Sequence, residues 1–152
     1  MRLLAAAFCL LALPAAAAGD FRTVGESAAV LYDAPSRQAT PLFVVTRNYP
    51  LEIVVELEAW AKVRDHAGAI SWVEKRLLTD KRMVVVTATS AEAHQRPEDG
   101  APVAFVAAQN VALELLEPEQ KGAQPGSHSG WLHVRHADGV DGFLRATACW
   151  GG

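Results

Sequence analysis

The stretch "EAWAKVRDHAGAISWVEKRLL", Glu58 to Leu78, holds two tryptophans on either side of a polar turn. A related stretch, "SGWLHVRHADGVDGFLRATAC", runs from Ser129 to Cys149. Displaced by 71 residues, the two align without a gap, and Trp60 coincides with Trp131. Internal self-similarity of this kind marks a structural unit that the chain builds twice.

The repeat continues upstream at a displacement of 62 residues, where Phe43 coincides with Phe105 and Asn48 with Asn110. The two displacements differ by a nine-residue insertion, which falls in the Gly-, Pro-, Ser- and Gln-rich loop "PEQKGAQPGSHSG", residues 118–130. Each copy has roughly sixty to seventy residues, enough to fold alone. We therefore expect two domains, over residues 20–80 and 82–150.

Both copies consist of short segments typical of β-strands. Gly68 and the pair Asp138-Gly139 lie in turns that favour hairpins, since glycine readily adopts a positive φ. Short strands separated by Gly- and Pro-containing turns predict an all-β fold of two small barrels. The expected strands are "LEIVVEL" (51–57), "WAKVR" (60–64) and "AISWV" (69–73) in the first copy, and "ALELLE" (112–117), "WLHVR" (131–135) and "VDGFL" (140–144) in the second.

Residues shared by the two copies are most simply explained by the shared fold. Apolar residues at these positions are expected to fill the two cores. They are Val63, Val73 and Phe43 in the first copy and Val134, Leu144 and Phe105 in the second.

The first eighteen residues have the pattern of a secretory signal peptide. Arg2 precedes an apolar run that is too short to span a bilayer, and small residues follow Pro14. We expect cleavage after Ala18 and a periplasmic or extracellular protein. The formal net charge is −3, and the sequence lacks the basic clusters that nucleic acid or an anionic membrane surface would require.

After cleavage the chain would retain one cysteine, Cys149. A single cysteine excludes an internal disulfide. Two alternatives remain, a small buried apolar residue and a thiol that reacts or pairs with another chain.

The order of these motifs resembles the bacterial SH3-like domain family. The resemblance rests on "AVLYDAPS" (29–36), "PLEIV" (50–54), "AWAKV" (59–63) and "SWV" (71–73), with second-copy counterparts "AEAHQRPE" (91–98), "ALELL" (112–116), "GWLHV" (130–134) and "GFL" (142–144). It covers nearly the whole chain after the signal peptide, in tandem. It implies partly open five-stranded barrels that bind rather than catalyse, in exported proteins that are often linked to the cell wall.

The resemblance also implies a ligand groove. Trp60 and Trp131 would line it, with Tyr32 as a second wall in the first copy and the insertion loop beside Trp131 in the second. Glu74 and Arg145 occupy the position at which polyproline-binding domains have proline, so a polyproline ligand is not expected.

Trp150 lies outside the repeated core. It would either cover the seam between the domains or stay exposed for a partner.

The sequence predicts no catalytic residues, no metal and no cofactor. Cys149 has no helix after it to lower its pKa, and His133 and His136 are three apart on a strand, so they point to opposite faces. We expect a binding or scaffolding module of the cell envelope that holds a peptide or protein through Trp60, Tyr32, Trp131 or Trp150. The alternatives are a peptidoglycan-peptide binder and a structural subunit of a larger envelope complex.

Overall fold

The computed structural model describes residues 19–116 and 130–152. The predicted signal peptide and nearly all of the insertion loop lie outside these residues. The described chain forms two seven-stranded antiparallel sheets and two three-residue 3₁₀ turns, Lys75–Leu77 and Ala146–Ala148. The all-β prediction of two small barrels is confirmed.

The first sheet has the strand order β3-β2-β6-β5-β4-β1-β7. Its strands are β1 (Phe21–Val24), β2 (Ala28–Tyr32), β3 (Pro41–Thr46), β4 (Pro50–Glu56), β5 (Trp60–Arg64), β6 (Ile70–Glu74) and β7 (Leu78–Thr79).

The second sheet has the order β10-β9-β13-β12-β11-β8-β14. Its strands are β8 (Met83–Val86), β9 (Ser90–His94), β10 (Val103–Ala108), β11 (Ala112–Leu115), β12 (Trp131–Arg135), β13 (Asp141–Arg145) and β14 (Cys149–Gly151). Each sheet has seven strands rather than the five that the resemblance implied, because short terminal segments such as β7 and β14 also pair.

The two sheets have the same topology, strand for strand. The displacements of 62 and 71 residues that align the sequence also carry each strand of the first sheet onto its counterpart in the second. The shared asparagines have a structural role, because Asn48 and Asn110 both adopt a positive φ, 69° and 67°, after β3 and β10. Asparagine tolerates this conformation better than most residues do.

Each barrel encloses its own apolar core. Val63 and Val73 are fully buried in the first and Val134 and Leu144 in the second, as predicted. The other buried members are Val24, Ala29, Leu31, Leu51 and Ala61 in the first core, and Val84, Val86, Ala91, Ala93, Ala107, Leu113 and Leu115 in the second.

The prediction that Phe43 fills a core is wrong, since its side chain is 52% exposed. Phe43 lies on β3, an edge strand of its sheet. Its counterpart Phe105 packs against the second core and against the ring of His136, at 5.6 Å between centroids. The first barrel has Asp65 at the position of His136, and Asp65 instead accepts hydrogen bonds from the turn amides of Ala67 and Ala69. Within residues 19–116 and 130–152, no ring therefore covers Phe43.

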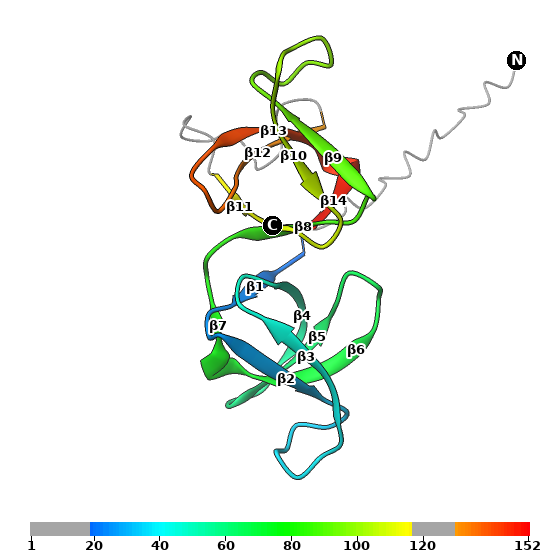
Figure 1. Cartoon of the computed structure of the whole chain (residues 1–152). Coiled ribbons are helices and arrows are strands. Elements are labelled where there is room, and N and C mark those ends of the chain that lie inside the picture. The colour runs from blue at the N-terminus through cyan, green and yellow to red at the C-terminus, as the bar shows by residue number, and fades with distance from the viewer. Residues whose placement is uncertain (1–18, 117–129) are drawn as a thin grey trace, which may run out of the picture.

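The two barrels are stacked end to end, with β8 and the C-terminus at their junction (Figure 1). In the part of the chain that the structure describes, no helix has the length and apolarity to cross a membrane.

Candidate functional site

The alternation of side chains along β5 and β6 places two tryptophans on the outside of the first barrel. Ala61, Val63 and Val73 point inward and are fully buried. Trp60 and Trp72, at the intervening positions, are half-buried and lie outside the core. Successive strand residues point to opposite faces, so the burial of the valines forces the tryptophans outward.

Three aromatic side chains gather on this outer surface, which we call the aromatic face: Tyr32, Trp60 and Trp72. Tyr32 meets Trp60 edge to face, with ring centroids 5.6 Å apart and planes at 83°. Tyr32 is also the direct cross-strand partner of Trp72. The Lys62 ammonium lies 5.8 Å from the Trp72 ring centroid. The predicted pairing of Trp60 with Tyr32 is thus what the structure shows.

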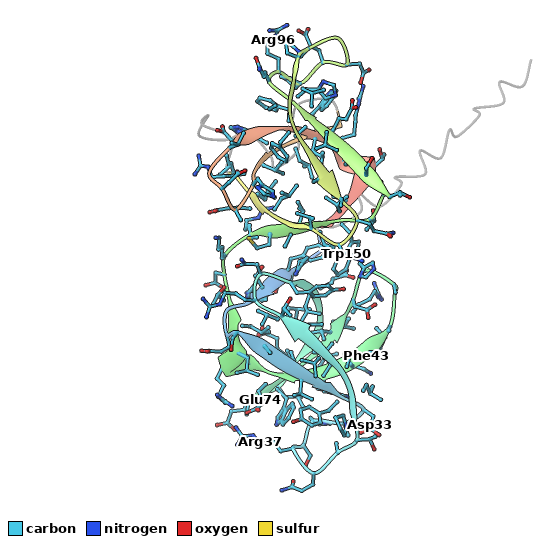
Figure 2. The ribbon with its side chains drawn as sticks, in the orientation of Figure 1. Asp33, Arg37, Phe43, Glu74, Arg96 and Trp150 are labelled. Carbon is cyan, nitrogen blue, oxygen red and sulfur yellow. The ribbon has the colours of Figure 1, made fainter. Side chains whose placement is uncertain are left out.

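A cluster of three charged residues borders the aromatic face. Glu74 lies directly across the β5–β6 ladder from Trp60. Arg37, from the loop between β2 and β3, donates to Glu74 Oε2 at 2.5 Å, and the Arg76 Nε donates to the same oxygen at 2.9 Å. Figure 2 shows Arg37 and Glu74 side by side at the foot of the first barrel. The hydrogen bonds from the two guanidinium groups hold the pKa of Glu74 at about 2.

The second barrel has the same arrangement with the charges reversed. Arg145 occupies the position of Glu74, and Asp99 occupies that of Arg37. The Arg145 Nη2 donates to Asp99 Oδ2 at 2.6 Å and its Nε to Oδ1 at 3.2 Å. This bidentate hydrogen bonding lowers the pKa of Asp99. An ion pair therefore links the loop between β2 and β3 to β6 in the first barrel. The equivalent pair links the loop between β9 and β10 to β13 in the second.

The reversal changes whether a charged side chain covers the tryptophan ring of each barrel. A carboxylate has no attraction for a ring face, whereas a guanidinium stacks on one. The Arg145 guanidinium carbon lies 4.2 Å from the Trp131 ring centroid, and His94 contacts the same ring edge to face at 5.4 Å. Trp131 is only 3% exposed. The Trp131 ring is therefore not accessible to a ligand while Arg145 stays in place. The insertion loop that was predicted to lie beside Trp131 is outside the described residues.

The rest of the second outer surface is more polar than the aromatic face. His133 stacks on Phe143 with centroids 4.5 Å apart, and its Nε2 lies 2.9 Å from Asp141 Oδ2. Val30 and Tyr32 of the first barrel correspond to Glu92 and His94. Over residues 19–116 and 130–152, no group of three or more His, Cys, Asp or Glu side chains is placed to hold a metal ion.

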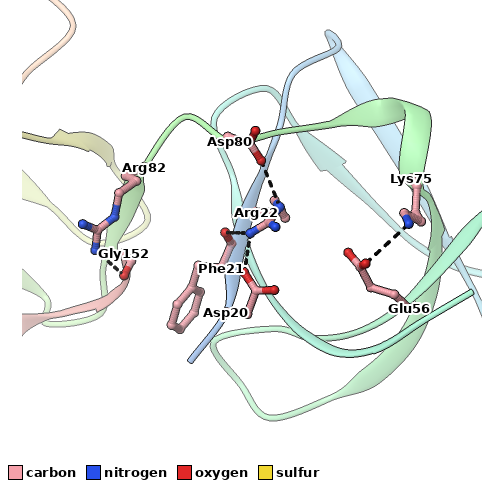
Figure 3. A network of polar contacts seen from close by, with 8 residues as sticks. All are labelled: Asp20, Phe21, Arg22, Glu56, Lys75, Asp80, Arg82 and Gly152. Atoms are coloured by element: carbon pink, nitrogen blue, oxygen red, sulfur yellow. Dashed lines mark hydrogen bonds and ion pairs between the residues drawn. The ribbon is translucent and has the colours of Figure 1, made fainter. Parts of the chain in front are cut away.

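Trp150 covers the seam between the barrels, the first of its two predicted alternatives. Its ring meets Phe21 of β1 edge to face, with centroids 5.1 Å apart. Figure 3 shows the surrounding polar contacts, in which the Arg82 Nη2 donates to the backbone oxygen of Gly152 at 2.7 Å and Arg22 pairs with Asp80 at 3.0 Å. The C-terminal strand thus links the second barrel to the first.

A cavity of about 290 Å³ also lies at this junction, lined by Asn48 of the first barrel and by residues of the linker and the second barrel. Two of its charged groups neutralise each other, because the Lys81 Nζ lies 3.2 Å from Glu114 Oε2.

Cys149 is half-buried against the second core and is not in a disulfide. Burial raises the pKa of its thiol to about 11, so at neutral pH the group stays protonated. A protonated thiol is a poor nucleophile, which favours the alternative of a small apolar residue.

Four members of the site were not predicted from the sequence: Trp72, Arg37, Glu74 and Arg76. Trp72 could have been found, because the inward-facing Val73 beside it requires it to point outward. The ion pair between Arg37 and Glu74 joins residues 37 positions apart and depends on how the loop folds back.

Comparison with known proteins supports the resemblance in the first barrel. Residues 25–80 match the family model described as bacterial SH3 domain. This segment contains Tyr32, Trp60, Trp72 and the charged cluster. No curated protein matches the sequence.

Among solved structures, the chain is similar to NlpC2 and NlpC1 from Trichomonas vaginalis, each at 14% identity, with TM-scores of 0.36 and 0.37. The matches cover 86% and 94% of this chain and 46% and 50% of those proteins. An NlpC/P60 family protein from Bacillus cereus matches at 15% identity and a TM-score of 0.39, over 88% of this chain and 56% of that one. The chain spans about half the length of these proteins.

Proposed function

We propose that this protein is a non-catalytic binding module of the cell envelope that holds a peptide or protein partner on the aromatic face of its first barrel. The observation that carries the proposal is the pair Tyr32 and Trp60, which meet edge to face outside the core and stay half-buried. Tyrosine and tryptophan offer large flat contact areas and lose little rotamer freedom on binding.

The difference between the copies supports a site on the first barrel. A tryptophan needed only for the fold would be equally covered in both barrels, but Trp131 lies beneath a guanidinium group and Trp60 does not. The surface beside the aromatic face is also apolar, since Val44 of β3 is 66% exposed and pairs with Val30. Exposed apolar groups that adjoin aromatic rings are typical of interaction sites.

The location rests on the sequence. Residues 1–18 have the signal-peptide pattern, and bacterial SH3 domains are an expected component of envelope proteins. The non-catalytic assignment is supported by the raised pKa of the Cys149 thiol and by the use of the described chain for two barrels.

The test is capture of a partner by the chain that begins at Gly19, in wild-type form and as Trp60→Ala. We expect the substitution to weaken partner capture at least about tenfold, the usual effect of losing an aromatic residue at the centre of an interface. Val103→Ala, at a 43% exposed position on the second barrel, is the control and should bind as the wild type does. Equal capture by Trp60→Ala, with an unchanged circular dichroism spectrum, would overturn the proposal.

The family match also favours a second candidate, a peptidoglycan-peptide binder. Incubation with purified sacculi distinguishes the two. Retention that requires Trp60 and no added protein would support the wall ligand. Absence of retention while a soluble protein partner is captured would exclude it.

The seam favours a third candidate, a structural subunit of a larger complex, because Trp150 and Phe21 join the barrels into one extended body. In that case partner capture would depend on surfaces other than the aromatic face and would survive Trp60→Ala.

A further inference from the structure

The charged cluster beside the aromatic face has an excess of one positive charge. Arg37 and Arg76 both bind the single carboxylate of Glu74, at 2.5 Å and 2.9 Å. A guanidinium group has five N–H donors. Arg37 uses one nitrogen, Nη2, in this contact, and Arg76 uses Nε and Nη2. The cluster therefore retains donors and charge for another acceptor.

The positive groups, not the carboxylate, face the solvent. The side chains of Arg37 and Arg76 are 60% and 64% exposed, whereas that of Glu74 is 14% exposed. The low pKa of Glu74 keeps it ionised at neutral pH, and both of its oxygens accept hydrogen bonds from the arginines. A ligand that approaches this corner meets two guanidinium groups and little of the carboxylate.

The cluster is part of the aromatic face rather than a separate surface. Glu74 lies directly opposite Trp60 in the β5–β6 ladder, and such pairs have Cβ atoms about 4.5–5.5 Å apart. Arg37 binds Glu74, the cross-strand neighbour of Trp60, and Trp60 in turn contacts Tyr32. A ligand resting on Trp60 and Tyr32 would therefore lie within reach of Arg37.

Other charges at the site do not cancel the excess. Lys62 adds a cation above Trp72 on the same face. Lys75 pairs with Glu56 at 3.4 Å. The acidic Asp33 lies on the other side of the loop from Arg37 in Figure 2, where its carboxylate accepts a hydrogen bond from the Thr40 amide.

We infer that the partner of the aromatic face is an acidic peptide, whose carboxylate binds Arg37 and Arg76 while an adjacent flat or apolar group packs on Trp60. This inference rests on the proposed function and adds the charge of the ligand. Planar guanidinium groups match carboxylate geometry, and the charge-assisted hydrogen bonds are stronger than neutral ones. A basic ligand would find the Glu74 carboxylate already paired with two cations.

The second barrel provides an internal contrast. Arg145 and Asp99 form a one-to-one bidentate pair, so among the described residues the equivalent corner has no excess charge, and its tryptophan, Trp131, is buried. The preference for an acidic peptide should therefore belong to the first barrel.

The experiment is a calorimetric titration of the chain that begins at Gly19 with two five-residue peptides, both acetylated and amidated. One alternates alanine with glutamate, and the other has glutamine in place of glutamate. At low ionic strength we expect the acidic peptide to bind at least about fivefold more tightly, as for exposed charge pairs that reinforce one another. Added salt should reduce the difference.

The double variant Arg37→Gln/Arg76→Gln should lose the preference, and both positions are exposed enough to tolerate glutamine. Arg96→Gln is the matched control, because Arg96 lies in the equivalent loop of the second barrel, is 61% exposed and pairs with Glu98. This variant should keep the preference.

Equal affinity for the two peptides, including no measurable binding of either, would overturn the inference, as would a preference that persists in the double variant. The proposed function would survive that result if partner capture still depended on Trp60, so the two failures are distinguishable.

Discussion

At the scale of single residues, one reversed ion pair separates the two barrels. Glu74 with Arg37 in the first becomes Arg145 with Asp99 in the second, and both pairs tie a loop to the same strand. The contribution of the pair to folding survives its reversal, since Coulomb attraction does not depend on which partner carries which sign. Stacking on a ring does depend on it, and so only Trp131 is covered.

This difference predicts the effect of Arg145→Ser. Loss of the guanidinium should expose Trp131, so acrylamide should quench the tryptophan emission more strongly than in the wild type. The lost cation–π contact should lower the free energy of unfolding by about 1 kcal/mol. Arg135→Ser is the control, at an exposed position on the same hairpin with no ring contact among the described residues. Unchanged quenching in folded Arg145→Ser would show that other groups cover the ring.

Glu74 predicts a specific dependence of stability on pH. The pKa of Glu74 falls from an ordinary 4.5 to about 2 in the folded chain. Its ionised form therefore stabilises the fold above pH 4.5, and this contribution is lost as the pH falls toward 2. Because its partners are largely exposed, we expect only about 1 kcal/mol.

Urea unfolding of the wild type and of Glu74→Gln at neutral pH and at pH 2 measures the contribution of Glu74 to the free energy of unfolding. The wild type should be more stable at neutral pH, and the two proteins should converge near pH 2. Glu58→Gln, at an exposed position with no ion pair in the described chain, is the control. A constant difference at both pH values would contradict the assignment to Glu74 ionisation.

At the scale of elements, the hairpins are fixed by their turns. Gly68 and Gly139 have φ of 86° and 92°, in the region that L-residues avoid, and space around both is open. The strands they connect pair as predicted, with Trp60 opposite Glu74 and Trp131 opposite Arg145.

Gly68→Ala should therefore destabilise the first barrel through backbone conformation alone, by about 1 kcal/mol. Thermal unfolding followed by circular dichroism measures the effect. Gly100→Ala is a matched control, because Gly100 also has open space around it but does not have a positive φ. An equal loss in both variants would mean that the turn conformation is not the cause.

The position of each strand in its sheet explains why the prediction for Phe43 was wrong. Strand periodicity places Val63 and Val73 in the core because each has a paired strand on both sides. Phe43 is equally apolar, but it lies on β3, an edge strand. Whether its ring is covered depends on the residue that a neighbouring turn places beside it. His136 covers Phe105, and Asp65 leaves Phe43 exposed. Only the folded arrangement specifies that contact.

At the scale of the whole molecule, the C-terminal strand joins two units that each have their own core. Trp150 pairs with Phe21, and Gly151 lies so close to the first barrel that an added Cβ would come within 3.0 Å of Pro50. Through these contacts the two barrels pack against each other and are joined by more than the linker between them.

The seam predicts a measurable coupling between the barrels. A double-mutant cycle of Phe21→Leu and Trp150→Leu should give a coupling energy of about 1 kcal/mol, as for other edge-to-face aromatic pairs. The free energies come from urea unfolding. Trp72→Leu, on the outer face away from the seam, should show no coupling with Phe21→Leu. Additive effects of the two substitutions would show that the contact between Phe21 and Trp150 does not form in solution.

The fold could be predicted from the sequence, because the repeat, the alternation of apolar residues and the turn glycines are local patterns that each specify a strand or a hairpin. The pairing of Tyr32 with Trp60 could also be predicted, through the resemblance of the motifs. Which tryptophans remain accessible could not be predicted in this way. Exposure depends on contacts between distant segments, such as His94 on Trp131, Asp99 on Arg145 and Phe21 on Trp150, and no local pattern specifies those contacts.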